Sequence, residues 1–183
     1  MRTYISIIWL IVLSFPLFGF TFSGVFRNDL VSGKKIAIST KKNPVARVVA
    51  FISAKCPCSA SHEKELKQLS EEFKNVEFIG FHSNQDEPSK LARNYFSKAH
   101  IGFSVFSDKD AKIADELGAF KTPHVFVFDS KSKLIYQGGV DDSHSLEKAS
   151  KHYLREVLNA VRDGRQPPYS ETRTLGCVIR RSA

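Results

Sequence analysis

The side chains best suited to covalent chemistry in this chain are its three cysteines. Cys56 and Cys58 flank Pro57, directly after the apolar, β-branched run Ala46–Ser53. We expect that run to form a buried strand and a helix to begin immediately behind it, with Cys56 at the helix N-terminus. Unpaired N–H groups and the positive end of the helix dipole stabilise an anion there. This position lowers the pKa of a thiol and makes it a better nucleophile.

The residues around Cys56 support this interpretation. Pro57 fits the first turn of a helix, where its missing N–H costs nothing, and Lys55 adds a nearby positive charge. Two alternatives stay open: Cys56 is a buried structural cysteine, or Cys56 and Cys58 bind a metal. No second CxxC or HxxxH pair completes a tetrahedral ligand set, so we expect no structural zinc site.

A second candidate site is the dipeptide Thr122-Pro123, which precedes the strand-like run HVFVFD at 124–129. Proline at the entry of a central strand removes a donor from the sheet. We therefore expect a cis-proline loop that lies beside the cysteine turn. His62 and His124 lie near the two motifs in the sequence. We interpret each as a surface or hydrogen-bonded histidine rather than a residue that faces the thiol.

The two motifs lie within an alternating series of strands and helices. After the first strand the pattern predicts a helix over Ser59–Lys74, a strand over Val76–His82, a helix over Glu87–Ala99, a strand over Phe103–Phe106, a helix over Ala111–Leu117, a hairpin of His124–Asp129 and Lys133–Gln137, and a helix from Leu146 to Gly164. Val25–Ser39 predicts a further hairpin around Gly33. We expect an α/β domain with a central mixed sheet, helices on both faces and an N-terminal hairpin extension.

A strand, then Cys-Pro-x-Ser, then a helix, with Thr-Pro before a hairpin, resembles the thioredoxin fold. Three segments make the likeness more specific: AFKTPHVFVFD at 119–129, YQGGVDDS at 136–143 and LGCVI at 175–179. With them the chain resembles the peroxiredoxin-like, or redoxin, branch of that superfamily (the alkyl-hydroperoxide-reductase and thiol-specific-antioxidant type). The resemblance covers essentially the whole chain after the N-terminal segment.

The resemblance implies roles for individual residues. Cys56 matches the nucleophilic cysteine, and Cys177 matches the cysteine of a C-terminal Gly-Cys-x-Ile motif. Ser59 stands where thioredoxin has its resolving cysteine, so Cys58 is the local substitute. Thr122-Pro123 is implied to present backbone to a bound partner chain.

Peroxidase chemistry has further requirements in the families that this chain resembles. True peroxiredoxins carry the pattern P-x-x-x-(T/S)-x-x-C and an arginine beside the reactive cysteine. Ser53 and Cys56 fit the end of that pattern, but Val49 stands at the proline position. Thr122-Pro123 occupies the region that usually supplies the arginine. The departures favour disulfide chemistry over peroxide chemistry.

Three functions follow as hypotheses. In the first, Cys56 attacks a disulfide or an oxidised thiol of a partner protein, and Cys58 or Cys177 resolves the adduct without a dissociable cofactor. In the second, a thiol peroxidase, Cys56 attacks a hydroperoxide and becomes a sulfenic acid. The third is a copper-handling binding module, since Cys-x-Cys suits Cu(I) and His62 or His144 offers a third ligand. Which thiols pair stays open, and so does a purely structural bridge between Cys58 and Cys177.

The N-terminal segment 1–23 has the layout of a secretory signal peptide. Arg2 precedes an apolar run from Tyr4 to Phe22, and cleavage after Ser23 leaves a small residue at the site. An uncleaved anchor is the alternative, because the run approaches the roughly 20 residues that span a bilayer. Either arrangement places the rest of the chain in the periplasm or otherwise outside the cytoplasm, where disulfides persist.

We expect the remainder to form one redoxin domain over 24–165 and a tail over 166–183 that carries Cys177. The chain has 183 residues, of which 42% are hydrophobic and 25% charged, and this composition excludes a disordered chain or a disulfide-dense miniprotein. The net charge of +8 is compatible with an anionic partner. The basic residues are nevertheless scattered and not interleaved with aromatic ones, so we expect no nucleic-acid partner. The expected partners are protein thiols and disulfides, or a hydroperoxide, together with a reducing protein.

Overall fold

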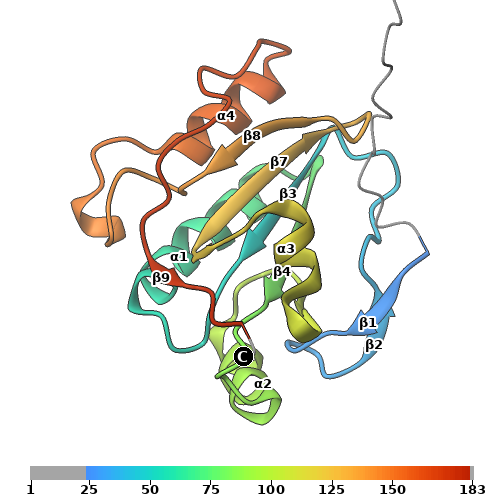
Figure 1. Cartoon of the computed structure of the whole chain (residues 1–183). Helices are drawn as coiled ribbons and strands as arrows, with labels where there is room; N and C mark the ends of the chain where they lie inside the picture. Colours follow the sequence, from blue (N-terminus) through green and yellow to red (C-terminus); the bar gives the residue numbers. More distant parts are fainter. Residues whose placement is uncertain (1–23, 182–183) are drawn as a thin grey trace, which may run out of the picture.

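The computed structural model describes residues 24–181. Within that range the chain is built around a five-stranded sheet with the order β5-β4-β3-β7-β8 (Figure 1). Its strands are β3 (Ala46–Phe51), β4 (Val76–His82), β5 (Val105–Ser107), β7 (His124–Asp129) and β8 (Leu134–Gly138). Strand β3 pairs in parallel with β4 and antiparallel with β7, which confirms the predicted mixed sheet.

Helices and two smaller strand pairs surround this sheet. The α-helices of the described chain are α1 (Pro57–Glu72), α2 (Ser89–Ala99), α3 (Lys112–Leu117) and α4 (Tyr153–Arg162). The smaller antiparallel pairs are β1 (Phe26–Asn28) with β2 (Lys35–Ala37), and β6 (Lys121–Thr122) with β9 (Cys177–Val178). The first pair is the predicted N-terminal hairpin. The second pair was not predicted, and it joins the tail to the domain.

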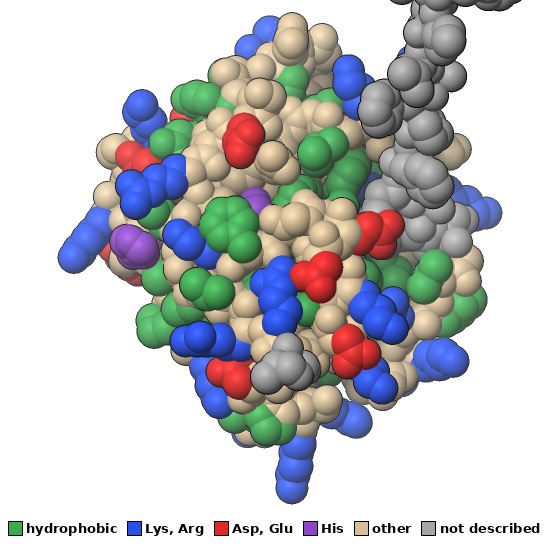
Figure 2. All heavy atoms as spheres, viewed as in Figure 1, with side chains coloured by type: hydrophobic (Ala, Val, Ile, Leu, Met, Phe, Trp, Pro, Cys, Tyr) green, Lys and Arg blue, Asp and Glu red, His purple; other side chains and the backbone are tan. Residues whose placement is uncertain are grey.

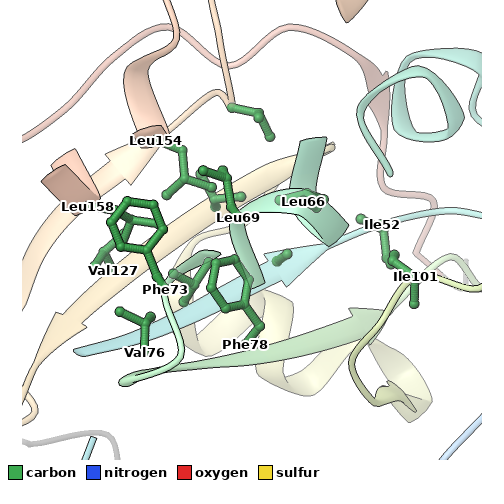
Figure 3. Close-up of a cluster of buried hydrophobic side chains, with 14 of the residues drawn as sticks. Ile52, Leu66, Leu69, Phe73, Val76, Phe78, Ile101, Val127, Leu154 and Leu158 are labelled. Carbon is green, nitrogen blue, oxygen red and sulfur yellow. The ribbon is translucent and has the colours of Figure 1, made fainter. Parts of the chain in front are cut away.

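Strand β3 is buried on both faces, as its β-branched sequence predicts. Because side chains alternate along a strand, Val48 belongs to one apolar cluster and Val49 to the other. On the first face the sheet packs against α1, α2 and α4, and Figure 3 shows Leu66 and Leu69 of α1 near Leu154 of α4. Each of these leucines is fully buried, and truncating one to alanine typically costs about 2–5 kcal/mol.

The second face of the sheet is covered by α3, by the N-terminal hairpin and by the tail. Phe51 and Phe126 meet edge to face there with ring centroids 5.7 Å apart. Ile38, Ala114 and Ile179 belong to the same cluster. In Figure 1 helix α3 lies in front of the sheet. The prediction of helices on both faces is therefore confirmed.

The helix predicted from Leu146 to Gly164 is wrong in its first half. Leu146–Lys148 form a 3₁₀ turn, the backbone at Ala149 is extended, and α4 begins only at Tyr153. The Asp142 carboxylate accepts hydrogen bonds from the N–H groups of Ser150 and Lys151, at 2.8 and 3.1 Å. Such side-chain bonds give the backbone an alternative to the helix, and apolar spacing alone does not reveal them.

The predictions for the N-terminal segment fall on residues 1–23, which lie outside the described range. Among the residues described, no helix is both long enough and apolar enough to cross a membrane. On the face drawn in Figure 2, Lys and Arg side chains are spread between acidic ones rather than gathered in one patch.

Candidate active site

Cys56 lies at the junction of β3 and α1. It is the N-cap residue of α1, with φ −80° and ψ 115°, and Pro57 is the first residue of the helix. The thiol-bearing residue is 3% exposed. Its N–H donates to Ser53 Oγ at 3.1 Å, and its carbonyl accepts the N–H of Ala60 at 3.0 Å. The predicted order of strand, cysteine and helix is thus confirmed.

A buried carboxylate, which the sequence analysis did not identify, fixes the turn before Cys56. Glu87 Oε2 accepts the N–H of Ala54 at 2.8 Å and contacts His82 Nε2 at 2.9 Å, and Glu87 Oε1 accepts the Ser53 hydroxyl. Burial raises the pKa of Glu87, but the hydrogen bonds from His82 and Ser53 reverse this, so the pKa lies below its ordinary value. A chain of bonds therefore runs from an ionised carboxylate through Ser53 to the Cys56 N–H.

The cis-proline loop meets the cysteine turn. The Thr122-Pro123 peptide bond is cis, as predicted. The Cys56 thiol donates to the Thr122 carbonyl oxygen at 3.0 Å. While the Cys56 thiol is protonated, the buried Thr122 hydroxyl has no hydrogen-bond partner, so it is free to donate to the Cys56 thiolate and to favour its formation. The fold thus brings together two motifs that are 66 residues apart in the chain.

The tail brings the third cysteine to the same place. In the β6–β9 pair Cys177 lies opposite Thr122, whose carbonyl accepts the Cys56 thiol, and the Cys177 thiol helps to lower the pKa of Cys56. Gly176 makes this approach feasible, because a Cβ atom there would lie 2.1 Å from the Thr122 carbonyl oxygen and its φ is +146°. The backbone of Thr122, which the resemblance implies is presented to a partner chain, is therefore paired with the protein's own tail.

The three thiols differ in acidity. Burial raises the pKa of Cys56, but hydrogen bonds from Cys177, from Thr122 and from the backbone of Ser59 outweigh it, so the pKa lies below its ordinary value. Burial, the hydrogen bond to Cys56 and the charge of its thiolate raise the pKa of Cys177 to about 12. Burial and the same charge raise the pKa of Cys58. Cys56 is thus the most acidic of the three thiols.

Cys58 interacts with the other two thiols and also contacts a histidine. All three cysteines are free, and Cys58 Sγ lies 3.5 Å from His144 Nδ1. His62 is a buried, hydrogen-bonded histidine, as predicted: Nδ1 contacts the Cys58 carbonyl at 2.6 Å and Nε2 contacts Asp141 at 2.9 Å.

His124 departs from the prediction that it is exposed or hydrogen-bonded. It is buried, its Nδ1 has no partner, and its ring packs on that of Phe126 with centroids 4.4 Å apart. Burial lowers its pKa to about 4, so the ring is neutral near pH 7. The sequence holds no signal for this, because the packing partners come from the sheet.

Comparison with known protein families identifies the family of this chain. A family model described as Redoxin matches residues 21–153. The match covers most of the chain, and the protein belongs to the Redoxin family, a branch of the thioredoxin-fold superfamily. No curated protein matches it.

Solved structures show the same fold. An uncharacterized conserved protein from Geobacillus kaustophilus is 24% identical, with a TM-score of 0.76 over 86% of this chain and 88% of its own. A hypothetical protein from Sinorhizobium meliloti 1021 is 23% identical, with a TM-score of 0.76 over 87% of this chain and 91% of its own. A secreted Mycobacterium tuberculosis disulfide oxidoreductase, homologous to E. coli DsbE, is 16% identical, with a TM-score of 0.56 over 76% of this chain and 95% of its own. The fold is therefore thioredoxin-like, with the N-terminal hairpin added to it.

Proposed function

We propose that this redoxin is a thiol–disulfide oxidoreductase in which Cys56 is the nucleophile and Cys177 is the resolving thiol. The observation that carries the proposal is the position of Cys177, which lies opposite Thr122 in the β6–β9 pair, where its thiol helps to lower the pKa of Cys56. The other thiol that the sequence offers, Cys58, also interacts with Cys56, but its Sγ lies 3.5 Å from His144 Nδ1 as well, and a Cys56–Cys58 disulfide would close a small, strained ring. The layout of segment 1–23 and the secreted neighbour from M. tuberculosis support a location outside the cytoplasm.

The chemistry is a pair of thiol–disulfide exchanges. The Cys56 thiolate attacks one sulfur of a partner disulfide, which forms a mixed disulfide and releases the other partner sulfur as a thiolate that takes up a proton. The Cys177 sulfur then loses its proton and attacks Cys56 Sγ, which releases the second partner thiol. The partner disulfide gains two electrons, and the protein ends with a Cys56–Cys177 disulfide that an external dithiol reduces.

The acidities of the thiols favour this order of events. While Cys56 is a thiolate, its charge and its hydrogen bond help to keep Cys177 protonated, and the pKa of Cys177 is about 12. Once Cys56 is part of a mixed disulfide, that charge and that acceptor are gone, and the pKa of Cys177 falls. The resolving thiol is therefore activated by the step that creates its target.

The two other hypotheses gain no support from the site. In the described part of the chain, the groups that shift the pKa of Cys56 include no arginine, which a peroxidase of this type uses. The cysteines and His144 also do not come together as a three-ligand metal set within residues 24–181.

The test compares Cys177→Ser with the matched Cys58→Ser variant in multiple-turnover reduction of a peptide disulfide, with a dithiol as the final reductant. We expect Cys58→Ser to turn over like the wild type. Cys177→Ser is expected to accumulate a mixed disulfide on Cys56 and to turn over at least about 100-fold more slowly. Mass spectrometry of the oxidised wild type should map a Cys56–Cys177 bridge. A stable Cys58–Cys177 bridge that leaves Cys56 free would overturn the assignment.

A further inference from the structure

A second group of ionisable side chains lies away from the thiols. It consists of Glu65 on α1, Asp141 after β8 and His152 before α4, and one donor atom from each lies within 4.8 Å of the other two. Glu65 and Asp141 are 3% and 1% exposed, whereas the His152 side chain is 39% exposed. The proposed disulfide exchange uses none of these residues.

Glu65 is held in this group with one oxygen unsatisfied. Its Oε1 contacts His152 Nδ1 at 3.1 Å and lies 3.8 Å from Arg155 Nε. Its Oε2 is buried and has no hydrogen-bond partner. A buried carboxylate with a free oxygen beside a second carboxylate is costly unless a proton or a cation neutralises it.

Asp141 is fixed from the opposite side. Its Oδ1 accepts the N–H of Ser143 at 2.8 Å, and its Oδ2 contacts His62 Nε2 at 2.9 Å. His62 is itself oriented by the Cys58 carbonyl at 2.6 Å from Nδ1. Hydrogen bonds of this kind orient the carboxylates and imidazoles that ligate metals in proteins.

We propose that Glu65, Asp141 and His152 bind a divalent first-row transition-metal ion of the zinc type. Two carboxylate oxygens and one imidazole nitrogen suit Zn²⁺, whereas Mg²⁺ and Ca²⁺ prefer oxygen ligands and Cu(I) prefers sulfur. The two carboxylate charges balance the charge of the ion. Tetrahedral bonds of about 2.1 Å place the donor atoms about 3.4 Å apart, so the group closes slightly around the ion. The exposed edge of His152 provides the route of entry.

The ion would link α1, which carries Glu65, to the segment 141–152, which carries the other two ligands. Without the ion, these three residues are linked to one another through side-chain contacts alone. That segment also carries His144, which contacts Cys58. Binding to the folded state alone stabilises it by mass action. The inference goes beyond the proposed function and does not depend on it.

The test must separate this site from the thiols, which also bind zinc. The purified chain with Cys56, Cys58 and Cys177 replaced by Ser is stripped with a chelator, reloaded with Zn²⁺ and freed of excess ion. Elemental analysis is expected to find one zinc per chain, and unfolding is expected to shift to a higher temperature when Zn²⁺ is added. In the wild type, Co²⁺ is expected to give d–d bands that persist after alkylation of the thiols.

Matched variants locate the ion. Glu65→Gln and His152→Ala are each expected to weaken zinc binding at least about tenfold and to abolish the thermal shift. Glu72→Gln removes a carboxylate from the same helix that contacts the same Arg155, outside the group, and should bind zinc like the parent. His152 is partly exposed, so its variant keeps the test valid if Glu65→Gln does not fold. No retained zinc in the thiol-free chain, or equal binding by His152→Ala, would overturn the proposal.

Discussion

Helix α1 carries two buried polar regions that stabilise charge by opposite means. At its N-terminus the Cys56 thiolate faces neutral donors: the Cys177 thiol, the Thr122 hydroxyl and a backbone N–H. Farther along the helix, His62 pairs with Asp141 at 2.9 Å, and Glu65 lies beside His152 and Arg155. We call the first the thiol region and the second the carboxylate–histidine region.

The difference shows how one helix serves reactivity and stability at the same time. Neutral donors lower the pKa of a thiol without neutralising the charge of the thiolate, so the anion stays available to attack. A buried carboxylate–histidine pair behaves differently, because removing either partner leaves the other buried without its hydrogen bond. We therefore expect substitutions in the thiol region to change chemistry, and those in the carboxylate–histidine region to change folding.

The largest expected effect is in the carboxylate–histidine region. Asp141→Ala removes the hydrogen-bond partner of the buried His62 and the acceptor of the Ser143 N–H, and it should lower the free energy of unfolding by about 2–4 kcal/mol. Cys177→Ala, the counterpart in the thiol region, removes one hydrogen bond and should cost about 1 kcal/mol. Urea unfolding followed by circular dichroism measures both values. Equal losses in the two variants would remove the contrast between the regions.

The second prediction concerns the tail that completes the thiol region. Gly176→Ala places a methyl group against the Thr122 carbonyl and should cost about 1–3 kcal/mol. The cost should be local, so that hydrogen exchange speeds up at the Ile179 N–H, which donates to the Phe120 carbonyl, but not in β3.

Gly164→Ala is the control for this substitution. Gly164 also has a positive φ, +65°, but a Cβ atom there would meet nothing within 4 Å. Its variant therefore carries the backbone strain without the clash. Unchanged exchange at Ile179 in Gly176→Ala would show that the β6–β9 pair does not depend on the glycine.

The smallest expected effect is a change in acidity. Cys177→Ala removes a donor to the Cys56 thiolate and should raise the pKa of Cys56, since that hydrogen bond is among the causes that lower it. The rise should be smaller in Cys58→Ala, because Cys58 interacts with Cys56 but is not among the main causes that lower the pKa of Cys56. Thiolate absorbance titrated against pH, together with the rate of alkylation at pH 7, measures the shift. An equal rise in the two variants would mean that Cys177 is not the dominant donor to the Cys56 thiolate.

Much of the fold could be predicted from the chain because its signals are local. Val76–His82 is a short run rich in large apolar residues, and it forms β4 with the predicted bounds. Gly118 ends α3 in a left-handed conformation, as its place after the helical pattern indicates. The helix expected from Leu146 failed because Asp142 captures backbone N–H groups eight and nine residues away. A periodicity argument does not include bonds of that kind.

The residues of the candidate site likewise differ in whether a local sequence pattern indicates them. Cys56 and the cis peptide before Pro123 were predicted from the strand, proline and helix pattern around them. Glu87 and Asp141 were missed as site residues, since each is one acidic residue among many in the sequence. Only their burial and their contacts with His82 and His62 distinguish them.

The sequence by itself determined that a thiol lies at the start of a helix, because a β-branched run, Cys-Pro and an amphipathic pattern are contiguous. Tertiary structure alone decided which thiol faces Cys56. Cys177 is 121 residues away along the chain, and it reaches Cys56 through the β6–β9 pair and the close approach of Gly176 to Thr122. Local propensities act over a few residues, whereas pairing between distant strands depends on where the whole sheet places their backbones.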